Sequence, residues 1–236
     1  MKLRPLKSVF AASLLFSAGI MSAQAASWEV DITNLTHGIH FTPLLVTAHD
    51  SSAHLFQSGM AASTDLKAMA ECGDTSALLT TLGGADDDTI DNPAAGLLAP
   101  GTSTMATITT TNNYLSLVAM MLPTNDGFVG MDAMMIPSDA GTYTFYLNSY
   151  DAGSEANDEL MDTSGCAPGM AGIPGAPGSD VGTGGSGVAS ADSNTMIHIH
   201  RGVFGDSNPA GGSSDLDNTI HRWQNPVAKV VVTVTP

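Results

Sequence analysis

Alternation of apolar and polar residues with a period of two is the feature that most restricts the fold of this chain. Trp28, Val30 and Ile32 alternate with polar residues, and residues 142–149 follow the same pattern. Successive side chains of a β-strand point to opposite faces of a sheet, so this period indicates strands with one buried face. Alternating or continuously apolar stretches bounded by turn residues recur along the chain, at residues 28–35, 44–48, 104–110, 114–122, 128–136, 142–149, 195–200 and 227–234. We therefore predict an all-β fold, an antiparallel β-sandwich of about eight strands.

The connections between these strands contain one helical region and one long loop. Ser63 can cap a short helix that runs through Leu66, and a second helix is predicted at residues 75–82. An acidic loop follows at residues 86–91. Residues 164–190 are rich in glycine, proline, serine and alanine without any periodicity, which is typical of an exposed irregular loop.

The amino terminus has the pattern of a secretory signal peptide. Three basic residues precede an apolar run at residues 9–21, and Ala23-Gln24-Ala25 fits a cleavage site. The run is shorter than the roughly 20 residues that span a bilayer. We predict a signal peptide at residues 1–25 and one domain at residues 26–236. The mature protein would be exported to the periplasm or the extracellular space, without insertion into a membrane.

The charge of the chain is strongly negative. It has 23 acidic residues against seven lysines and arginines, and removal of residues 1–25 would leave only four of the basic ones. Such a charge repels nucleic acid and favours divalent cations or cationic partners. Acidity that only keeps an exported protein soluble is the alternative. We expect Asp158, Glu159 and Asp162 to be surface charge, with the supply of a further ligand to a bound cation as the alternative.

Cys72 and Cys166 are the only two cysteines of the chain. An exported domain meets an oxidising environment, so a disulfide between them is expected, with two separate thiols as the alternative. Closing so long a loop would stabilise the fold by about 4 kcal/mol in the chain-entropy model.

Two acidic segments follow apolar strands and are candidates for a metal site. They are Asn-Asp-Gly-Phe-Val-Gly at residues 125–130 and Tyr-Asp-Ala-Gly-Ser-Glu at residues 150–155. If the loops meet at one end of a sandwich, Asp126, Asp151 and Glu155 offer carboxylates to calcium, which takes about 6–8 oxygen ligands and tolerates irregular geometry. The glycine in the second segment, at position 153, allows a tight turn. Acidic loops that are simply solvated are the alternative.

These segments resemble the spondin N-terminal domain, and especially its bacterial single-domain members. The resemblance extends to Phe41-Thr42-Pro43, to Ile-His-Ile-His-Arg-Gly at residues 197–202 and to Asn-Pro-Val-Ala-Lys-Val at residues 225–230. It implies a C2-like β-sandwich that carries a calcium ion in loops at one end, in a family best known from extracellular-matrix adhesion proteins.

The resemblance also implies which residues bind the ion. The aspartate before the Phe-Val-Gly strand and two acidic positions of the Tyr-Asp-Ala-Gly loop correspond to Asp126, Asp151 and Glu155. Gly127 stands where animal members often have an aromatic residue, and Glu155 stands where they have aspartate. The thrombospondin-type repeats of the animal proteins are absent, which removes any basis for transferring their partners.

Histidines form a rival metal-binding pattern. His198 and His200 would share one face of a strand, with the isoleucines on either side of His198 facing the core. With a third ligand such as His37 or His40, two imidazoles at this spacing can bind zinc or copper. A solvated strand face is the ordinary alternative.

The sequence carries none of the common catalytic motifs, so we expect no enzyme activity. The function expected from the sequence is an exported, calcium-binding, non-catalytic adhesion or binding module, whose partner is an extracellular protein, matrix component or glycan. The alternative is a periplasmic copper- or zinc-binding protein that uses His198 and His200.

Overall fold

The structure, a computed structural model, describes residues 25–82, 88–162, 166–167, 169–178, 182–189 and 194–235. Residues 1–24 of the predicted signal peptide lie outside the described residues, as do residues 86 and 87 of the predicted acidic loop, whose last three residues form a strand instead. No helix in the described ranges is long and apolar enough to cross a membrane.

The described residues form ten strands and two short helices. In chain order they are β1 (Ala26–Asn34), β2 (His40–Phe41), β3 (Leu45–His49), α1 (Thr64–Cys72), α2 (Ser76–Leu82), β4 (Thr89–Asp91), β5 (Ser103–Thr110), β6 (Tyr114–Leu122), β7 (Gly127–Met135), β8 (Gly141–Asp151), β9 (His198–Ile199) and β10 (Ala228–Thr235). This confirms the predicted all-β fold and both predicted helices.

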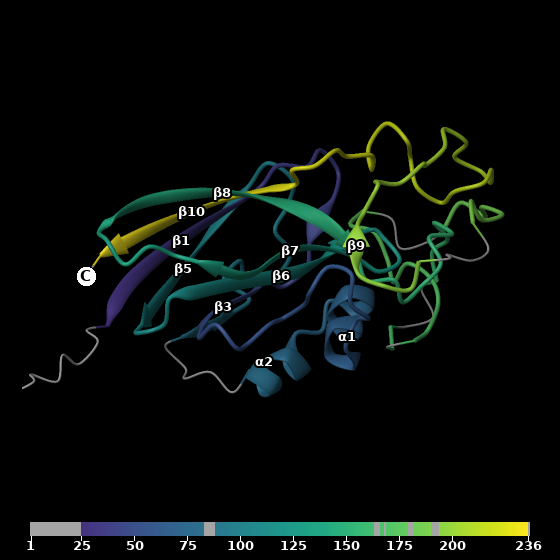
Figure 1. Cartoon of the computed structure of the whole chain (residues 1–236). Helices are drawn as coiled ribbons and strands as arrows, with labels where there is room; N and C mark the ends of the chain where they lie inside the picture. Colours follow the sequence, from purple (N-terminus) through teal and green to yellow (C-terminus); the bar gives the residue numbers. More distant parts are fainter. Residues whose placement is uncertain are drawn as a thin grey trace, which may run out of the picture.

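The strands pair antiparallel in the order β4-β3-β6-β7-β8-β10-β1-β5, with β2 added to β6 and β9 added to β8. The sheet curls until β5, at one end of this order, lies against β3 and β4 at the other. It is therefore nearly closed, with two layers facing each other across the core (Figure 1).

The core lies between the two layers, and the apolar residues of the predicted alternation point into it. Trp28, Val30 and Ile32 of β1 are 2 % exposed or less, and Val30 pairs with Val232 of β10 and with Ala106 of β5. These side chains pack in the same cluster as residues of β6 and β7 from the opposite layer. Each large apolar side chain buried in this way contributes roughly 1.5–3 kcal/mol to stability.

A second, smaller core lies on the outer face of β6 and β7, where α1 covers the sheet. This covering explains why β6 is apolar throughout, since both of its faces are buried. Helix α1 begins where the sequence predicts, because the Ser63 side chain accepts the Leu66 N–H at 3.1 Å. It ends at Gly73, whose φ of 69° is left-handed.

The strand predictions were incomplete in two places. Strands β2 and β4 were not predicted, because two or three residues are too few to show a period and only pairing with neighbouring strands forms them. The strand predicted at residues 195–200 is reduced to β9, His198–Ile199. The prediction that Ile199 faces the core is wrong, since it is 43 % exposed at the edge of the sheet.

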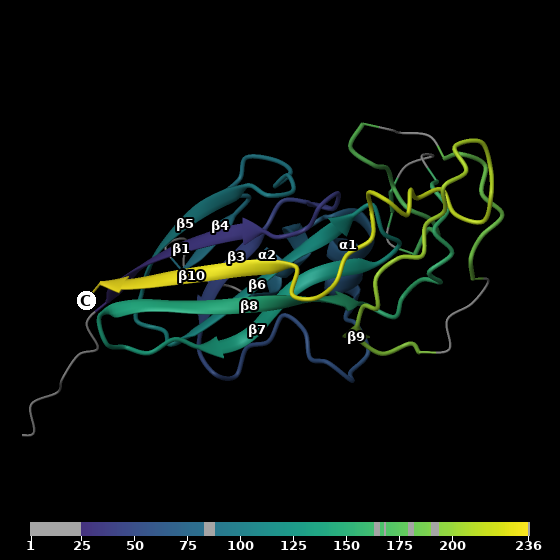
Figure 2. The same cartoon turned by 90° about the horizontal axis from the view of Figure 1, so that it is seen from above.

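The long connections after β8 gather at one end of the sandwich. Figures 1 and 2 both show the segment between β8 and β10 at the end opposite the C-terminus, beside β9. The turn between β6 and β7 opens at the same end, because β7 begins where β8 ends. All the predicted calcium-binding residues therefore lie in this region.

Candidate metal centre

Asp126 and Asp151 lie at the same end of two adjacent strands. Asp126 directly precedes β7, Asp151 is the last residue of β8, and the antiparallel register pairs Gly127 with Asp151. The two segments are also joined by the Ala152 N–H, which donates to the Asp126 carbonyl at 3.2 Å. The prediction that the two acidic loops meet at one end of the sandwich is confirmed.

Asp126 anchors the loop that follows β8. Its side chain is fully buried, and Oδ2 accepts hydrogen bonds from Ser154 N at 2.7 Å, Ser154 Oγ at 3.1 Å and Glu155 N at 3.1 Å. Its other oxygen, Oδ1, is buried and has no hydrogen-bond partner among the described residues. A buried carboxylate oxygen without a partner is costly, because it has lost water and gained nothing in exchange.

Asp151 shapes the turn of the same loop. Its Oδ1 accepts the Gly153 N–H at 2.8 Å, and its Oδ2 accepts from Asn157 Nδ2 at 2.7 Å. Gly153 has a φ of 67°, and a Cβ there would lie 2.7 Å from the Thr195 carbonyl carbon. Only glycine fits this turn. Since each carboxylate oxygen has two lone pairs, Asp151 keeps the capacity to bind a cation.

Glu155 lies in the same loop, four residues after Asp151. Its Oε2 accepts the Gly172 N–H at 3.0 Å and is 3.5 Å from Asn125 Nδ2. Its Oε1 is buried and, within the described part of the chain, has no hydrogen-bond partner. Glu155 thus repeats the pattern of Asp126, with one oxygen bound to the protein and one unpaired.

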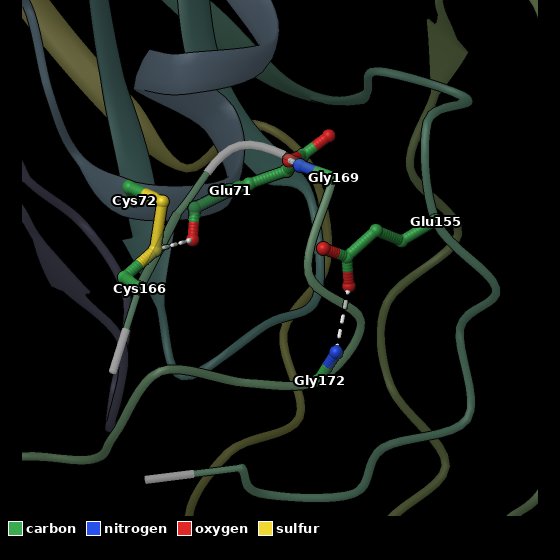
Figure 3. Close-up of a disulfide and its surroundings, with 6 residues drawn as sticks. All are labelled: Glu71, Cys72, Glu155, Cys166, Gly169 and Gly172. Carbon is green, nitrogen blue, oxygen red and sulfur yellow. Dashed lines mark hydrogen bonds between the residues drawn. A yellow bond between two sulfur atoms is a disulfide. The ribbon is translucent and has the colours of Figure 1, made fainter. Parts of the chain in front are cut away.

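Glu71 is an acidic residue beside Glu155 that the sequence did not indicate. It lies in the last turn of α1 and is 2 % exposed, and its Oε2 accepts the Gly169 N–H at 2.6 Å. Figure 3 shows the side chains of Glu71 and Glu155 directed from opposite sides toward the segment that contains Gly169 and Gly172. Its position next to Cys72 is the one signal that could have placed it near this loop.

The predicted disulfide between Cys72 and Cys166 is confirmed, with a Cα–Cα distance of 5.6 Å. It joins the end of α1 to the beginning of the segment that binds both glutamates (Figure 3). Cys166 Sγ also lies 3.3 Å from the carbonyl oxygen of Glu71. The disulfide therefore closes a long loop and also holds in place the segment that hydrogen-bonds to Glu155.

The pKa values in this region are displaced in the direction that favours neutral carboxyl groups. Burial, with the Asp151 charge second, raises the pKa of Asp126. Burial also raises the pKa of Glu155 from an ordinary value of 4.5 to about 7, and the nearby charges of Glu71 and Asp126 add to the rise while the Gly172 N–H opposes it. Nearby positive charge would lower both pKa values, and a divalent cation would supply it.

The carboxylates of Asp126, Asp151 and Glu155 are the kind of ligand that a hard cation prefers, although the three side chains are not grouped around one point. No three His, Cys, Asp or Glu side chains within the described ranges form a ready-made metal-binding group. Asp126, Asp151 and Glu155 nevertheless lie on two segments that hydrogen-bond to each other, and two of their oxygens are buried and unpaired. Calcium accepts carboxylates in irregular geometry, whereas magnesium requires a near-ideal octahedron, so calcium suits these residues better.

Gly127 lies in a turn where its neighbours leave little space for a side chain. A Cβ at this position would lie 2.7 Å from Thr124 Oγ1 and 3.1 Å from His200 Cδ2. The turn before β7 is therefore too tight in this chain for any larger side chain.

His198 and His200 lie in different surroundings. His198 Nδ1 donates to the Met196 carbonyl at 2.8 Å, and its Nε2 lies 3.7 Å from Asp151 Oδ2. His200 is buried, its Nδ1 accepts the Gly202 N–H at 3.0 Å, and its ring lies 5.0 Å from that of Trp223.

The other two histidines of the alternative metal site are not beside this pair. His37 and His40 line a separate cavity together with His221, whereas His200 lines a cavity beside Asp151. The structure therefore does not bring either of the suggested third ligands into the cavity that His200 lines.

The expectation that Glu159 is surface charge is wrong. It is 3 % exposed, and its carboxylate accepts hydrogen bonds from Phe204 N at 2.6 Å, Gly205 N at 2.9 Å and Ser214 Oγ at 2.6 Å. Its φ is 59°, which is unusual for a residue other than glycine. Glu159 organises the loops after β9, and no local pattern in the sequence distinguishes it from the solvated carboxylates around it.

The fold and this region together define an all-β protein with buried acidic loops at one end of a nearly closed antiparallel sandwich. The chain belongs to the Spondin_N family, whose family model matches residues 29–164, more than half of its length. This confirms the resemblance drawn from the sequence. Asp126, Asp151 and Glu155 fall inside the matched range, whereas the similar segments at residues 197–202 and 225–230 fall outside it. No curated protein matches the chain.

Proposed function

We propose that this chain is an exported, non-catalytic, calcium-binding module in which Asp126, Asp151 and Glu155 hold the ion. The observation that carries the proposal is the pair of buried carboxylate oxygens, Asp126 Oδ1 and Glu155 Oε1, that have no partner among the described residues. Two such oxygens on adjoining loops, in carboxyl groups whose pKa values are raised chiefly by burial, are suited to bind a cation.

The proposed role of calcium is to hold together the two loops that carry its ligands. The ion would supply the positive charge that these carboxylates lack, while Asp126 keeps its bonds to the backbone of Ser154 and Glu155. We expect a weak affinity of about 10⁻⁴–10⁻³ M, as in other extracellular modules. From family membership we further propose attachment to an extracellular protein, matrix component or glycan.

The test compares melting temperatures in calcium and in EDTA for the wild type, Asp126→Asn and Asp139→Asn. Calcium should raise the melting temperature of the wild type, because a ligand that binds only the folded state stabilises it by mass action. Asp126→Asn should lose this rise yet melt normally in EDTA, because its amide oxygen can still face the three donors around Oδ2. Asp139 is exposed in the hairpin between β7 and β8, so its variant is a matched control.

The same assay separates the alternative function. Stabilisation by zinc or copper but not by millimolar calcium, lost in His198→Ala, would favour a transition-metal protein. A wild-type melting temperature that is the same in calcium and in EDTA would contradict the calcium site.

A further inference from the structure

A cavity of about 230 Å³ opens beside Asp151 at the loop end of the sandwich. Its walls include His200, Arg201, Phe204 and Arg222. All four follow residue 164, so they lie outside the range matched by the Spondin_N family model. The calcium proposal gives this cavity no role.

The cavity contains an unusual share of the positive charge of the protein. Beyond residue 25 the chain has four basic residues, and two of them, Arg201 and Arg222, line this one cavity. Both arginines are exposed, and neither guanidinium forms a salt bridge or a hydrogen bond with another described residue.

The carboxylates in the wall accept hydrogen bonds from other groups and not from the two arginines. Both oxygens of Glu159 accept hydrogen bonds from the loops after β9, and those of Asp151 accept from Gly153 N and Asn157 Nδ2. The two arginines therefore remain available to an anion from outside. A guanidinium presents a planar fork of N–H donors that matches the two oxygens of a carboxylate.

An aromatic side chain at the same cavity adds a second kind of contact. Phe204 is 72 % exposed, the most exposed of the large apolar side chains in the described residues. Its backbone N–H is fixed by Glu159 Oε1 at 2.6 Å, so the position of the residue is defined although its ring is open to solvent. An exposed phenyl ring offers an apolar face on which the C–H face of a sugar ring can be buried.

We propose that this cavity binds one acidic sugar residue, a uronate, with its carboxylate held by Arg201 and Arg222 and its ring against Phe204. The volume is below the roughly 300–1,000 Å³ of pockets for drug-sized ligands, which agrees with a single sugar unit of a longer glycan. An aspartate or glutamate side chain of a peptide would supply the carboxylate but has no rigid face to cover the phenyl ring. The site does not depend on calcium, although it shares Asp151 with the calcium proposal.

The experiment is an isothermal titration of the wild-type protein with trigalacturonate, in EDTA and again in calcium. Binding should be measurable in EDTA and absent with a neutral galactose oligomer. Arg201→Gln with Arg222→Gln should weaken binding by about ten-fold or more, because the double variant loses the charge-assisted hydrogen bonds to the carboxylate. Lys67→Gln with Lys229→Gln removes the same charge elsewhere on the chain and should bind as the wild type does.

Two further variants keep the result interpretable. Phe204→Ser should weaken binding several-fold without changing the melting temperature, because its ring is exposed. Arg201→Lys with Arg222→Lys keeps the charge but not the fork, and should bind less tightly than the wild type.

Several outcomes would overturn the proposal. They are no binding by the wild type in EDTA, unchanged binding by the double arginine variant, or binding that requires calcium and ignores the arginines. A short polyglutamate peptide that binds as tightly as trigalacturonate would identify an acidic-peptide site instead. The calcium proposal is judged separately by its melting temperatures and can fail while this one stands.

Discussion

Gly172 donates its backbone N–H to Glu155 Oε2 at 3.0 Å, a few positions after Cys166 is bonded to Cys72. A proposed calcium ligand is thus held by a segment that a disulfide fastens to a helix on the other side (Figure 3). The covalent bond and the proposed ion therefore act on the same loop.

Reduction of the disulfide should both destabilise the protein and weaken its response to calcium. Loss of the cross-link should lower the free energy of unfolding by about 4 kcal/mol, since the closed loop is long. Urea unfolding of oxidised and reduced protein, each in calcium and in EDTA, measures both effects. The chain has no other cysteine, so a reductant acts only here. An equal calcium response in the two forms would show that Glu155 does not depend on this support.

The stability of the calcium-free protein should fall as the pH rises from about 4.5 to about 7. In this range folded Glu155 holds a proton that the unfolded chain has released, because burial raises its pKa in the folded state to about 7. The folded state binds more protons there, so its stability decreases with increasing pH. Melting temperatures in EDTA at several pH values test this, and Glu155→Gln should reduce the slope.

Calcium affinity should change with pH in the opposite sense. Protons compete with the ion for Glu155 and Asp126, whose pKa values are both raised. Titration of calcium at pH 8 and at pH 5.5 should give clearly weaker binding at the lower pH. Equal affinity at the two values would mean that these carboxylates are not ligands.

Glu159→Gln should destabilise the protein by about 2–3 kcal/mol. The carboxylate accepts from Phe204 N, Gly205 N and Ser214 Oγ, and a glutamine would turn an NH₂ group toward at least one donor. Urea unfolding measures the loss. Glu29→Gln, at an exposed position of β1, removes the same charge and should be nearly neutral. A similar small effect in both would show that Glu159 is ordinary loop charge.

Gly127→Ala should cost about 1–3 kcal/mol, because a Cβ would press against Thr124 Oγ1 at 2.7 Å within a buried turn. Gly141→Ala is the matched control. There the nearest atom is the hydroxyl of Tyr143 at 3.3 Å, at the end of a side chain that can shift. Thermal melts of the two variants should differ clearly, and equal melting temperatures would refute the steric explanation for Gly127.

Much of the fold could be predicted because its strands are long enough to show a period. The alternation of Trp28, Val30 and Ile32 matches their burial in β1, and the unbroken apolar run of β6 matches its two covered faces. The Ser63 cap and the turn at Gly153 could also be predicted, because both depend on one residue and its near neighbours.

Contacts between distant segments were harder to predict. Glu159 could not be separated from other acidic residues, since its partners follow it by more than forty positions. Glu71 lies far from Glu155 in the chain and near it in space. Ile199 is exposed because β9 ends there at the sheet edge, and no pattern of a few residues reveals where pairing stops.

On its own, the sequence determined the long strands, the two helices, the expected cysteine pair and the position of Asp126 and Asp151 at the ends of neighbouring strand segments. Each of these follows from local period, local capping or chain order. Tertiary structure alone decided which oxygens are buried without a partner, which acids are held by distant backbone N–H groups and that two arginines line one cavity. Burial and long-range hydrogen bonding depend on all the surrounding chain at once, so no single segment encodes them.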